Sequence, residues 1–242
     1  MSGHSKWATT RRSKAATDAK RAVLFTKLAK GITIAAREKG GDPTANFSLR
    51  LAIEKAKAAN MPKENIDRAI KRGTGELAGA VIEETFYEGF GPGKTAFIIK
   101  CLTDNKNRTS QEIKHLFSKY GGALAGPNAV MWQFEHKGVI RLANEQLAGK
   151  NPENLELQFI DLGAQDIIKE EDSLIIYCKI EDLQKVKKGI EDLGFTVDYA
   201  EIEFVPKEKI TVSEELANKN QEFFEDLDEN EDVDDYYTNL KE

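Results

Sequence analysis

The spacing of the apolar residues changes once along the chain, and this change separates two kinds of structure. Within residues 1–73, apolar side chains such as Phe25, Leu28 and Ile32 recur every three to four positions, which predicts amphipathic helices. Residues 74–80, TGELAGA, have the composition of a linker. Beyond them the apolar residues alternate with polar ones, as they do in strands. The chain is therefore predicted to begin with a bundle of three short helices and to continue with strands and helices.

The elements predicted beyond the linker fall into two sets. Residues 138–204 follow the order strand, helix, strand, strand, helix, strand, which is a complete ferredoxin-like βαββαβ unit. Residues 79–136 supply two strands, a helix and a further strand at 130–134. Residues 205–242 supply one helix and one strand, which are too little to be stable alone. We expect these last two elements to complete the sheet begun by residues 79–136.

The expected fold class is therefore α+β, with an N-terminal three-helix domain and two α/β domains, the last of them a ferredoxin-like βαββαβ unit inserted into the second. The length of 242 residues also suits two or three modest domains. The predicted domains are a basic helical domain, a discontinuous α/β domain and an inserted ferredoxin-like domain, at residues 1–78, 79–136 plus 205–242, and 137–204, respectively.

Two short segments resemble functional loops but predict ordinary structure, and a third predicts the start of a helix. Residues 89–94, GFGPGK, lack the spacing of a Walker phosphate loop and precede a strand, so we expect a hairpin turn. Residues 109–112, TSQE, form a capping box that predicts the start of a helix. The acidic residues at 225–235 miss the register of a calcium loop. We expect them to be solvated or to repel nucleic acid.

Charge is distributed unevenly along the chain. Residues 1–73 hold 17 Lys and Arg against 6 Asp and Glu, a net charge of +11. The remaining residues hold 18 Lys and Arg against 35 Asp and Glu, a net charge of −17, and the whole chain carries −6. This asymmetry predicts that the N-terminal part faces a polyanion.

Composition argues against several other kinds of function. No apolar run approaches the ~18 residues of a membrane-spanning helix, and the N-terminus has no apolar signal-peptide core. Cys101 and Cys178 lie in strand-like runs and are expected to be buried free thiols of a reducing compartment. His4, His115 and His136 lie far apart, without metal-ligand spacing or a nucleophile. We expect a cytoplasmic, non-catalytic protein with no metal, cofactor, membrane contact or small-molecule substrate.

The segment best suited to nucleic acid is 3–21, GHSKWATTRRSKAATDAKR. Its cations suit phosphates, because each neutralised phosphate releases condensed counterions. Trp7 offers a ring that either stacks on an unpaired base or packs against the helical bundle. His4 and Ser5 offer hydrogen bonds to phosphate or sugar. The cations of this segment are Lys6, Arg11, Arg12, Lys14, Lys20 and Arg21.

Two further groups of cations are candidates. The first group lies on the second and third predicted helices, where a solvated helix face is the alternative interpretation. Its members are Lys55, Lys57, Lys63, Arg68, Lys71 and Arg72. The second group, Lys106 and Arg108, lies between a strand and a helix, whose N-terminus would favour a phosphate. A capped turn is the alternative there.

These segments resemble the YebC/PmpR family, which includes the mitochondrial translational activator of cytochrome oxidase subunit one. The resemblance spans nearly the whole chain. It is carried by GHSKW (3–7), KAATDAKR (14–21), FTKLAKGITIAAREKGGDP (25–43), KAKAANMPKENIDRAIKRGTG (55–75), YEGFGPGK (87–94), TDNKNRTSQEIKHLFSKYGG (103–122) and LDENEDVDDYYTN (227–239). The resemblance implies a helical domain and two α/β domains around a cleft, a cytoplasmic location and a role in gene expression. Bacterial members are commonly described as DNA-binding transcriptional regulators, whereas others act on translation at the ribosome.

The expected function is nucleic-acid-binding regulation of gene expression, with DNA-binding transcriptional control as the leading interpretation. A ribosome-associated translation factor that binds ribosomal or messenger RNA is the alternative, and an enzyme acting in the interdomain cleft is a remote one. The third helix offers only Asn65, Arg68 and Arg72 for reading base edges. The residues alone therefore favour RNA or single strands slightly.

Overall fold

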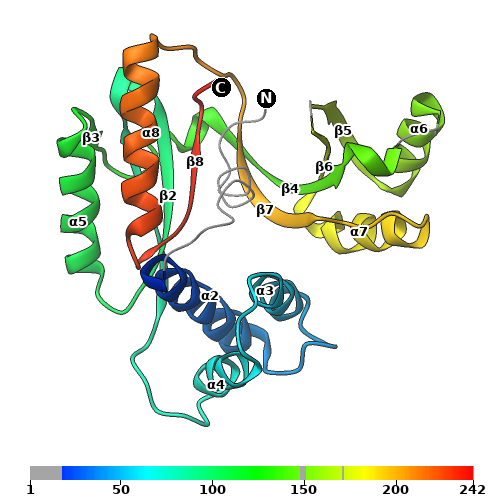
Figure 1. Cartoon of the computed structure of the whole chain (residues 1–242), viewed down its shortest axis with the longest axis horizontal. Helices are drawn as coiled ribbons and strands as arrows, with labels where there is room; N and C mark the ends of the chain where they lie inside the picture. Colours follow the sequence, from blue (N-terminus) through cyan, green and yellow to red (C-terminus); the bar gives the residue numbers. More distant parts are fainter. Residues whose placement is uncertain (1–17, 148–150, 171, 242) are drawn as a thin grey trace. The chain divides into compact units, whose positions relative to one another are not determined.

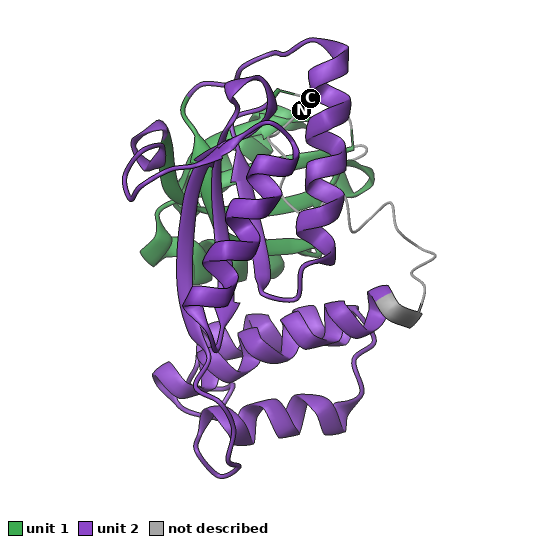
Figure 2. Cartoon of the chain, turned by 90° about the vertical axis from the view of Figure 1, so that its left-hand side faces the viewer, with its two compact units in different colours: residues 1–3, 134–207, 241–242 green, residues 4–133, 208–240 purple. Residues whose placement is uncertain are grey.

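The computed structural model describes residues 18–147, 151–170 and 172–241 (Figure 1). The chain forms two compact units (Figure 2). The smaller unit contains residues 134–207, and the larger contains the described residues before 134 together with residues 208–240. The fold class is α+β as predicted, with N-terminal helices followed by two antiparallel sheets. The separation of the larger unit into a helical domain and an α/β domain stays a prediction.

The N-terminal helices of the larger unit pack their apolar faces into one core. Ile32, Leu49 and Ile66 are buried there, one from each helix. The helices are α2 (Asp18–Lys39), α3 (Phe47–Ala58) and α4 (Lys63–Gly73). Amphipathic spacing explains this packing, because each helix turns one apolar face toward the shared core.

Asn46 joins the end of α2 to the start of α3. Its side-chain oxygen accepts a hydrogen bond of 3.0 Å from the Leu49 N–H, which caps α3. Its side-chain nitrogen donates to the backbone oxygens of Ala35, at 2.7 Å, and Gly40, at 2.8 Å. The first of these carbonyls lies in the last turns of α2 and the second just beyond its end. One buried side chain therefore satisfies both helix ends.

The helices α2 and α4 approach each other closely. A Cβ atom at Gly73 would lie 2.4 Å from the backbone oxygen of Thr33, so this crossing requires glycine. The Thr33 hydroxyl lies 3.1 Å from the backbone oxygen of Ala69 on α4. This contact fixes the distance between the two helices at one end of the bundle.

The sheet of the larger unit has the strand order β3-β1-β2-β8, and its paired strands are antiparallel. The helices α5 (Lys106–Lys119) and α8 (Glu214–Glu229) cover one of its faces. Phe97, Phe117 and Phe223 meet between them, with ring centroids 5.0–6.1 Å apart. The strands are β1 (Glu83–Phe90), β2 (Ala96–Thr103), β3 (Ala123–Leu124) and β8 (Val233–Thr238). The C-terminal helix and strand thus complete this sheet, as predicted.

Strands β1 and β2 form a hairpin around the 3₁₀ turn η1 (Pro92–Lys94). Gly93 has a φ of +74°, a left-handed conformation that suits glycine in such a turn. The hairpin turn predicted for residues 89–94 is confirmed.

The strand predicted at 130–134 is wrong. Most of this segment forms the 3₁₀ turn η2 (Met131–Gln133), and the short β3 instead supplies the edge strand beside β1. The buried carboxylate of Glu88 occupies backbone N–H groups of this region, accepting hydrogen bonds of 2.6–2.8 Å from Asn128, Val130 and Met131. Because these donors are bound to a side chain, they cannot serve a strand ladder.

The capping box predicted at 109–112 is also wrong. Helix α5 begins at Lys106, four residues earlier than the capping box predicts, and Asn105 caps it by accepting a hydrogen bond of 3.1 Å from the Arg108 N–H. Thr109 is buried inside the helix, with its hydroxyl 2.7 Å from a carboxylate oxygen of Asp232. The threonine therefore makes a tertiary contact instead of a cap.

The smaller unit has the ferredoxin-like arrangement that its element order predicts. Its sheet has the order β5-β6-β4-β7 with antiparallel pairs. Phe159 and Val186 on the two helices are buried, as are Ile140 and Ile176 on the central strands. The elements are β4 (Phe134–Ala143), α6 (Pro152–Leu162), β5 (Ala164–Lys169), β6 (Ser173–Cys178), α7 (Leu183–Asp192) and β7 (Tyr199–Pro206), with 3₁₀ turns η3 (Asn144–Leu147) and η4 (Ile180–Asp182).

Candidate nucleic-acid interface

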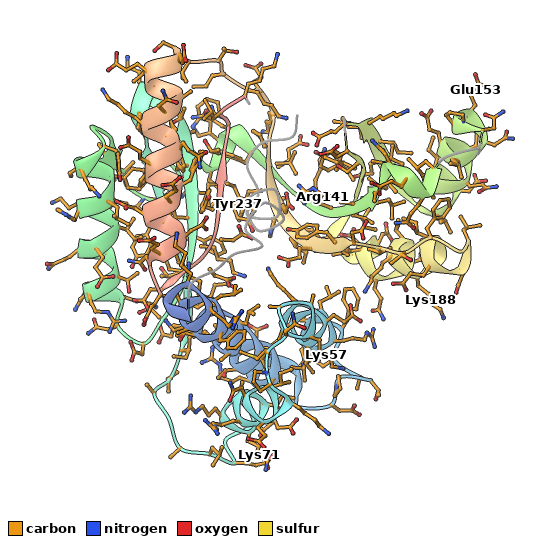
Figure 3. All side chains as sticks on the ribbon, in the orientation of Figure 1. Lys57, Lys71, Arg141, Glu153, Lys188 and Tyr237 are labelled. Atoms are coloured by element: carbon orange, nitrogen blue, oxygen red, sulfur yellow. The ribbon has the colours of Figure 1, made fainter. Side chains whose placement is uncertain are left out.

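The predicted nucleic-acid contacts divide between residues that the structure describes and residues that it does not. Those outside the described residues are His4, Ser5, Lys6, Trp7, Arg11, Arg12 and Lys14. The others lie on α2, α3, α4 and α5. Figure 3 shows all described side chains and labels Lys57 on α3 and Lys71 on α4.

One group of predicted cations is exposed and has no acidic partner among the residues that the structure describes. We call this group the α3–α4 cations: Lys57, Lys63, Arg68, Lys71 and Arg72. None of them forms an ion pair with another described residue. Lys55 on α3 and Arg21 on α2 are exposed as well. Residues 1–73 hold too few Asp and Glu residues to neutralise their lysines and arginines. The exposed cations therefore present a positive potential to solvent.

Another group of predicted cations pairs with acids. Lys20 lies 3.2 Å from Glu229, and both side chains are more than half exposed, at 56% and 59%. Lys106 pairs with Glu83. Arg108 lies 3.1 Å from Asp104 and 2.7 Å from Asp232. Lys106 and Arg108 were candidates for a phosphate contact at the start of α5. The structure shows a capped helix end there, and both cations pair with acids.

Asp232 brings together groups from α2 and α5. Its oxygens lie 2.6 Å from the Lys30 ammonium, 2.7 Å from the Arg108 guanidinium and 2.7 Å from the Thr109 hydroxyl. Asp232 is only 4% exposed, and burial by itself raises the pKa of a carboxyl. Hydrogen bonds from Arg108, Lys30 and Thr109 outweigh burial and lower the pKa of Asp232 to about 2. The carboxyl is therefore charged at neutral pH and holds α2 against the sheet.

Lys27 makes a second link between α2 and the C-terminal elements. Its ammonium donates to the backbone oxygen of Asp228 at 2.5 Å and lies 3.5 Å from that of Leu227. These carbonyls belong to the last turn of α8, where a cation is favourable because the helix dipole is negative. Lys27 is 3% exposed. It therefore stabilises the interior of the unit and does not face solvent.

Sequence reasoning missed the structural roles of Lys27, Lys30 and Asp232. The two lysines lie about 200 positions before their partners, and no local pattern reports such a contact. The acidic C-terminal residues, expected to be solvated or repulsive, instead supply several ion-pair partners. Asp226 pairs with Lys119, Glu229 with Lys20, and Asp232 with Lys30.

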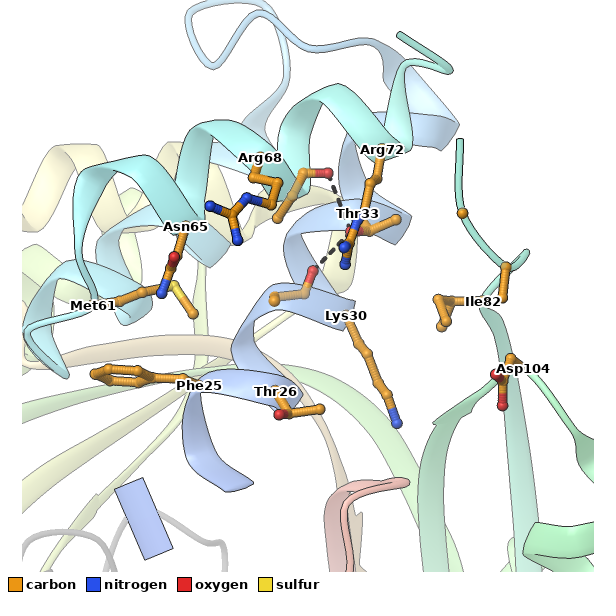
Figure 4. A pocket seen from close by; sticks show the side chains of 14 residues that line it. Phe25, Thr26, Lys30, Thr33, Met61, Asn65, Arg68, Arg72, Ile82 and Asp104 are labelled. Carbon is orange, nitrogen blue, oxygen red and sulfur yellow. Dashed lines mark hydrogen bonds between the residues drawn. The ribbon is translucent and has the colours of Figure 1, made fainter. Parts of the chain in front are cut away.

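A groove of about 470 Å³ runs between α2 and α4 (Figure 4). We call it the α2–α4 groove. Helix α4 contributes Asn65, Arg68 and Arg72, whose spacing places them on one side of the helix. Phe25 and Met61 lie together at one end of the groove in Figure 4. Its other lining residues are Thr26, Ala29, Lys30, Thr33, Ala69, Gly79, Ala80, Ile82 and Asp104.

The described residues include no helix that could span a membrane, no cluster that could hold a metal ion and no exposed cysteine. No described helix is both long and apolar enough to cross a membrane. Across the described ranges, no three His, Cys, Asp or Glu side chains are grouped so as to hold a metal ion. Cys101 and Cys178 are buried free thiols, as predicted. Burial raises the pKa of Cys178 to about 11, so this thiol stays protonated at neutral pH.

These features define an α+β protein with a basic helical N-terminal part followed by two antiparallel sheets. The chain belongs to the TACO1/YebC family, as its sequence motifs predict. Residues 5–76 match the TACO1/YebC protein N-terminal domain, and residues 82–240 match the TACO1/YebC second and third domain.

Relatives match the chain over its whole length. A probable transcriptional regulatory protein of Thermotoga maritima is 48% identical over 100% of this chain and 94% of its own length. Another, from Thermoanaerobacter pseudethanolicus, is 46% identical over 100% of this chain and 97% of its own. The crystal structure of a conserved hypothetical protein from Aquifex aeolicus is similar, with a TM-score of 0.83 and 40% identity over 95% of each chain.

Proposed function

We propose that this protein is a nucleic-acid-binding regulator of gene expression that grips its target through the basic helical segment. The observation that carries the proposal is the set of α3–α4 cations, which are exposed and lack an acidic partner among the described residues. Each such cation can neutralise a phosphate and release condensed counterions, which is the main source of non-specific affinity. Binding, without catalysis, is the activity proposed, and its place is the cytoplasm.

DNA is the target that we propose first. Relatives 46–48% identical over the full chain are named probable transcriptional regulatory proteins, and control of transcription commonly acts through DNA. In this proposal the segment at 3–21 adds further phosphate contacts through Lys6, Arg11, Arg12 and Lys14. Trp7 would add stacking on a base or sugar.

A second target, RNA at the ribosome or in a messenger, is favoured by one observation. Asn65, Arg68 and Arg72 line the α2–α4 groove. A helix that reads base edges in the major groove must stand clear of its own protein. Polar side chains that line a groove suit nucleotides that are not held in a duplex, which are the usual targets of sequence-specific RNA recognition.

The experiment that tests the proposal compares two matched triple substitutions in the full chain. The first changes Lys57, Lys63 and Lys71 to Gln. The second changes Lys179, Lys185 and Lys188 to Gln, which removes the same charge from exposed positions of the smaller unit. Binding to a promoter duplex and to a ribosomal RNA fragment is measured by fluorescence anisotropy from 50 to 300 mM salt.

We expect the first triple to reduce the slope of log affinity against log salt by about two to three units, because three phosphate contacts are lost. The second triple is expected to leave the slope unchanged. Equal slopes for both variants and the unmodified protein would refute the proposed interface. The tighter of the two probes at one salt concentration identifies the target.

A further inference from the structure

The α2–α4 groove differs from the rest of the basic surface because it brings two cations without an ion-pair partner among the described residues next to an apolar end. Lys30 lines the groove, but Asp232 at 2.6 Å balances its charge. Asp104 lines it too, and Arg108 at 3.1 Å balances that acid. Arg68 and Arg72 have no ion-pair partner in the part of the chain that the structure describes. Among the described residues that line the groove, the guanidinium groups of Arg68 and Arg72 are therefore the charges that no acid neutralises.

The spacing of these two arginines suits one phosphate group. Residues four apart on a helix have Cβ atoms about 5–6 Å apart, so both long side chains can reach the same anion. A guanidinium presents a planar fork of donors that matches the oxygens of a phosphate. Figure 4 shows Arg68 and Arg72 extending from α4 over the groove.

The other end of the groove is apolar and contains an aromatic ring. Phe25 is half-buried and Met61 is buried, and both line the groove. A flat ring stacks on the face of any base, and a thioether packs well against aromatic systems. Asn65 lies on the same side of α4 as the arginines, and its amide offers both a donor and an acceptor to a base edge.

We propose that the α2–α4 groove binds one unpaired nucleotide, with its base against Phe25 and Met61 and its phosphate at Arg68 and Arg72. This proposal rests on the proposed nucleic-acid function and specifies the form of the ligand. The volume of about 470 Å³ lies within the range of about 300–1,000 Å³ that is usual for small-ligand pockets. A base within a duplex is stacked on both faces and cannot reach the ring of Phe25, so the groove selects single strands.

The test uses the full chain, three probes and two matched double substitutions on the same helix. The probes are twelve-nucleotide single strands of adenylate, as RNA and as DNA, and the blunt duplex of the DNA strand with its complement. One variant changes Arg68 and Arg72 to Gln. The other changes Lys63 and Lys71 to Gln, which removes the same charge from α4 outside the groove.

We expect the arginine variant to bind both single strands at least about tenfold more weakly than the lysine variant, since it loses charge-assisted hydrogen bonds. On the duplex the two variants are expected to lose affinity equally. Phe25→Leu keeps most of the apolar volume but removes the ring. It is expected to weaken single-strand binding by between about fivefold and a hundredfold, with duplex binding unchanged. Melting temperatures of all variants, together with retained duplex binding, establish that they are folded.

Equal losses for the two double variants on every probe would overturn the groove proposal while leaving the proposed function intact. Failure of the unmodified protein to bind any of the three probes would instead overturn the proposed function itself. Tighter binding of the RNA strand than of the DNA strand would make RNA the ligand. Equal binding would mean that the groove recognises the unpaired nucleotide without contacting the 2′-hydroxyl.

Discussion

Lysines and arginines of one helical bundle occupy two different surroundings. Lys27 and Lys30 on α2 face the C-terminal elements, where they contact the end of α8 and the buried carboxylate of Asp232. The α3–α4 cations face solvent and have no ion pair among the described residues. The same residue types therefore stabilise the fold on one side of the bundle and remain available to a ligand on the other.

The difference has a simple electrostatic cause. A charge removed from water must be paired and hydrogen-bonded, because its desolvation costs several kcal/mol. A charge at the surface keeps its hydration and gains little from a partner. The net charge of +11 over residues 1–73 therefore does not measure the charge that faces a polyanion, since it includes Lys27 and Lys30, which contact the C-terminal elements. Burial decides which cations count toward it.

The largest effect is expected from Asp232→Ala. This change leaves the Lys30 ammonium and the Thr109 hydroxyl without their buried acceptor, and breaking a buried pair costs ~3–5 kcal/mol. Urea unfolding should show a loss of that size in the larger unit. Nucleic-acid affinity of the folded protein, measured at low temperature, should not fall, because the change removes an acid beside Lys30, which lines the α2–α4 groove. Lost affinity with unchanged stability would show that Asp232 belongs to the binding surface.

A smaller effect is expected from acid. The pKa of Asp232 is lowered to about 2, against ~3.9 for an unfolded aspartate. The native state therefore binds fewer protons than the unfolded state in this window. About 2 kcal/mol of stability is present above pH ~4 and is lost as the pH falls from ~4 to ~2.

Comparison with Asp232→Asn isolates this contribution, because the amide does not titrate. The difference in unfolding free energy between the unmodified protein and Asp232→Asn should be largest at pH 6 and should shrink toward pH 2. A constant difference across that range would mean that the charge of Asp232 contributes nothing to stability.

The smallest effect is expected at the exposed pair of Lys20 and Glu229. Both side chains are more than half exposed, and such pairs contribute ~0.2–1 kcal/mol. Glu229→Gln should lower stability by less than 1 kcal/mol by this reasoning. It should also raise nucleic-acid affinity slightly, because Lys20 loses its competing acid. Unchanged affinity in Glu229→Gln and weakened affinity in Lys20→Gln would show that Lys20 contacts phosphate despite the pair.

Sequence patterns predicted those parts of the fold that depend on neighbouring residues. The ferredoxin-like unit follows from alternating and helical spacing between residues 138 and 204, and each element has its predicted type. The hairpin at 89–94 likewise follows from local glycine and proline chemistry.

The errors arose where a distant side chain competes with the local pattern. Residues 130–134 alternate like a strand, but Glu88, about 40 positions earlier, binds their backbone N–H groups. Thr109 has the sequence context of a cap, but its hydroxyl reaches Asp232. The groove at Arg68 and Arg72 was predicted as two basic residues on a helix, whereas its recess depends on the crossing of α2 and α4. The spacing of residues along the chain cannot predict how these two helices cross.

The links from α2 to the end of α8 and to Asp232 also set an order for folding. Helices α2, α3 and α4 leave the ribosome early and can form from local contacts. Lys27 and Lys30 nevertheless find their partners about 200 residues later in the chain. Contacts of such high sequence separation form slowly, because a long loop must close before they are made. Until the end of α8 and Asp232 have been synthesised, neither Lys27 nor Lys30 can make these contacts. Contact with the end of α8 then makes Lys27 an interior charge, and contact with Asp232 gives Lys30, which lines the α2–α4 groove, its acidic partner.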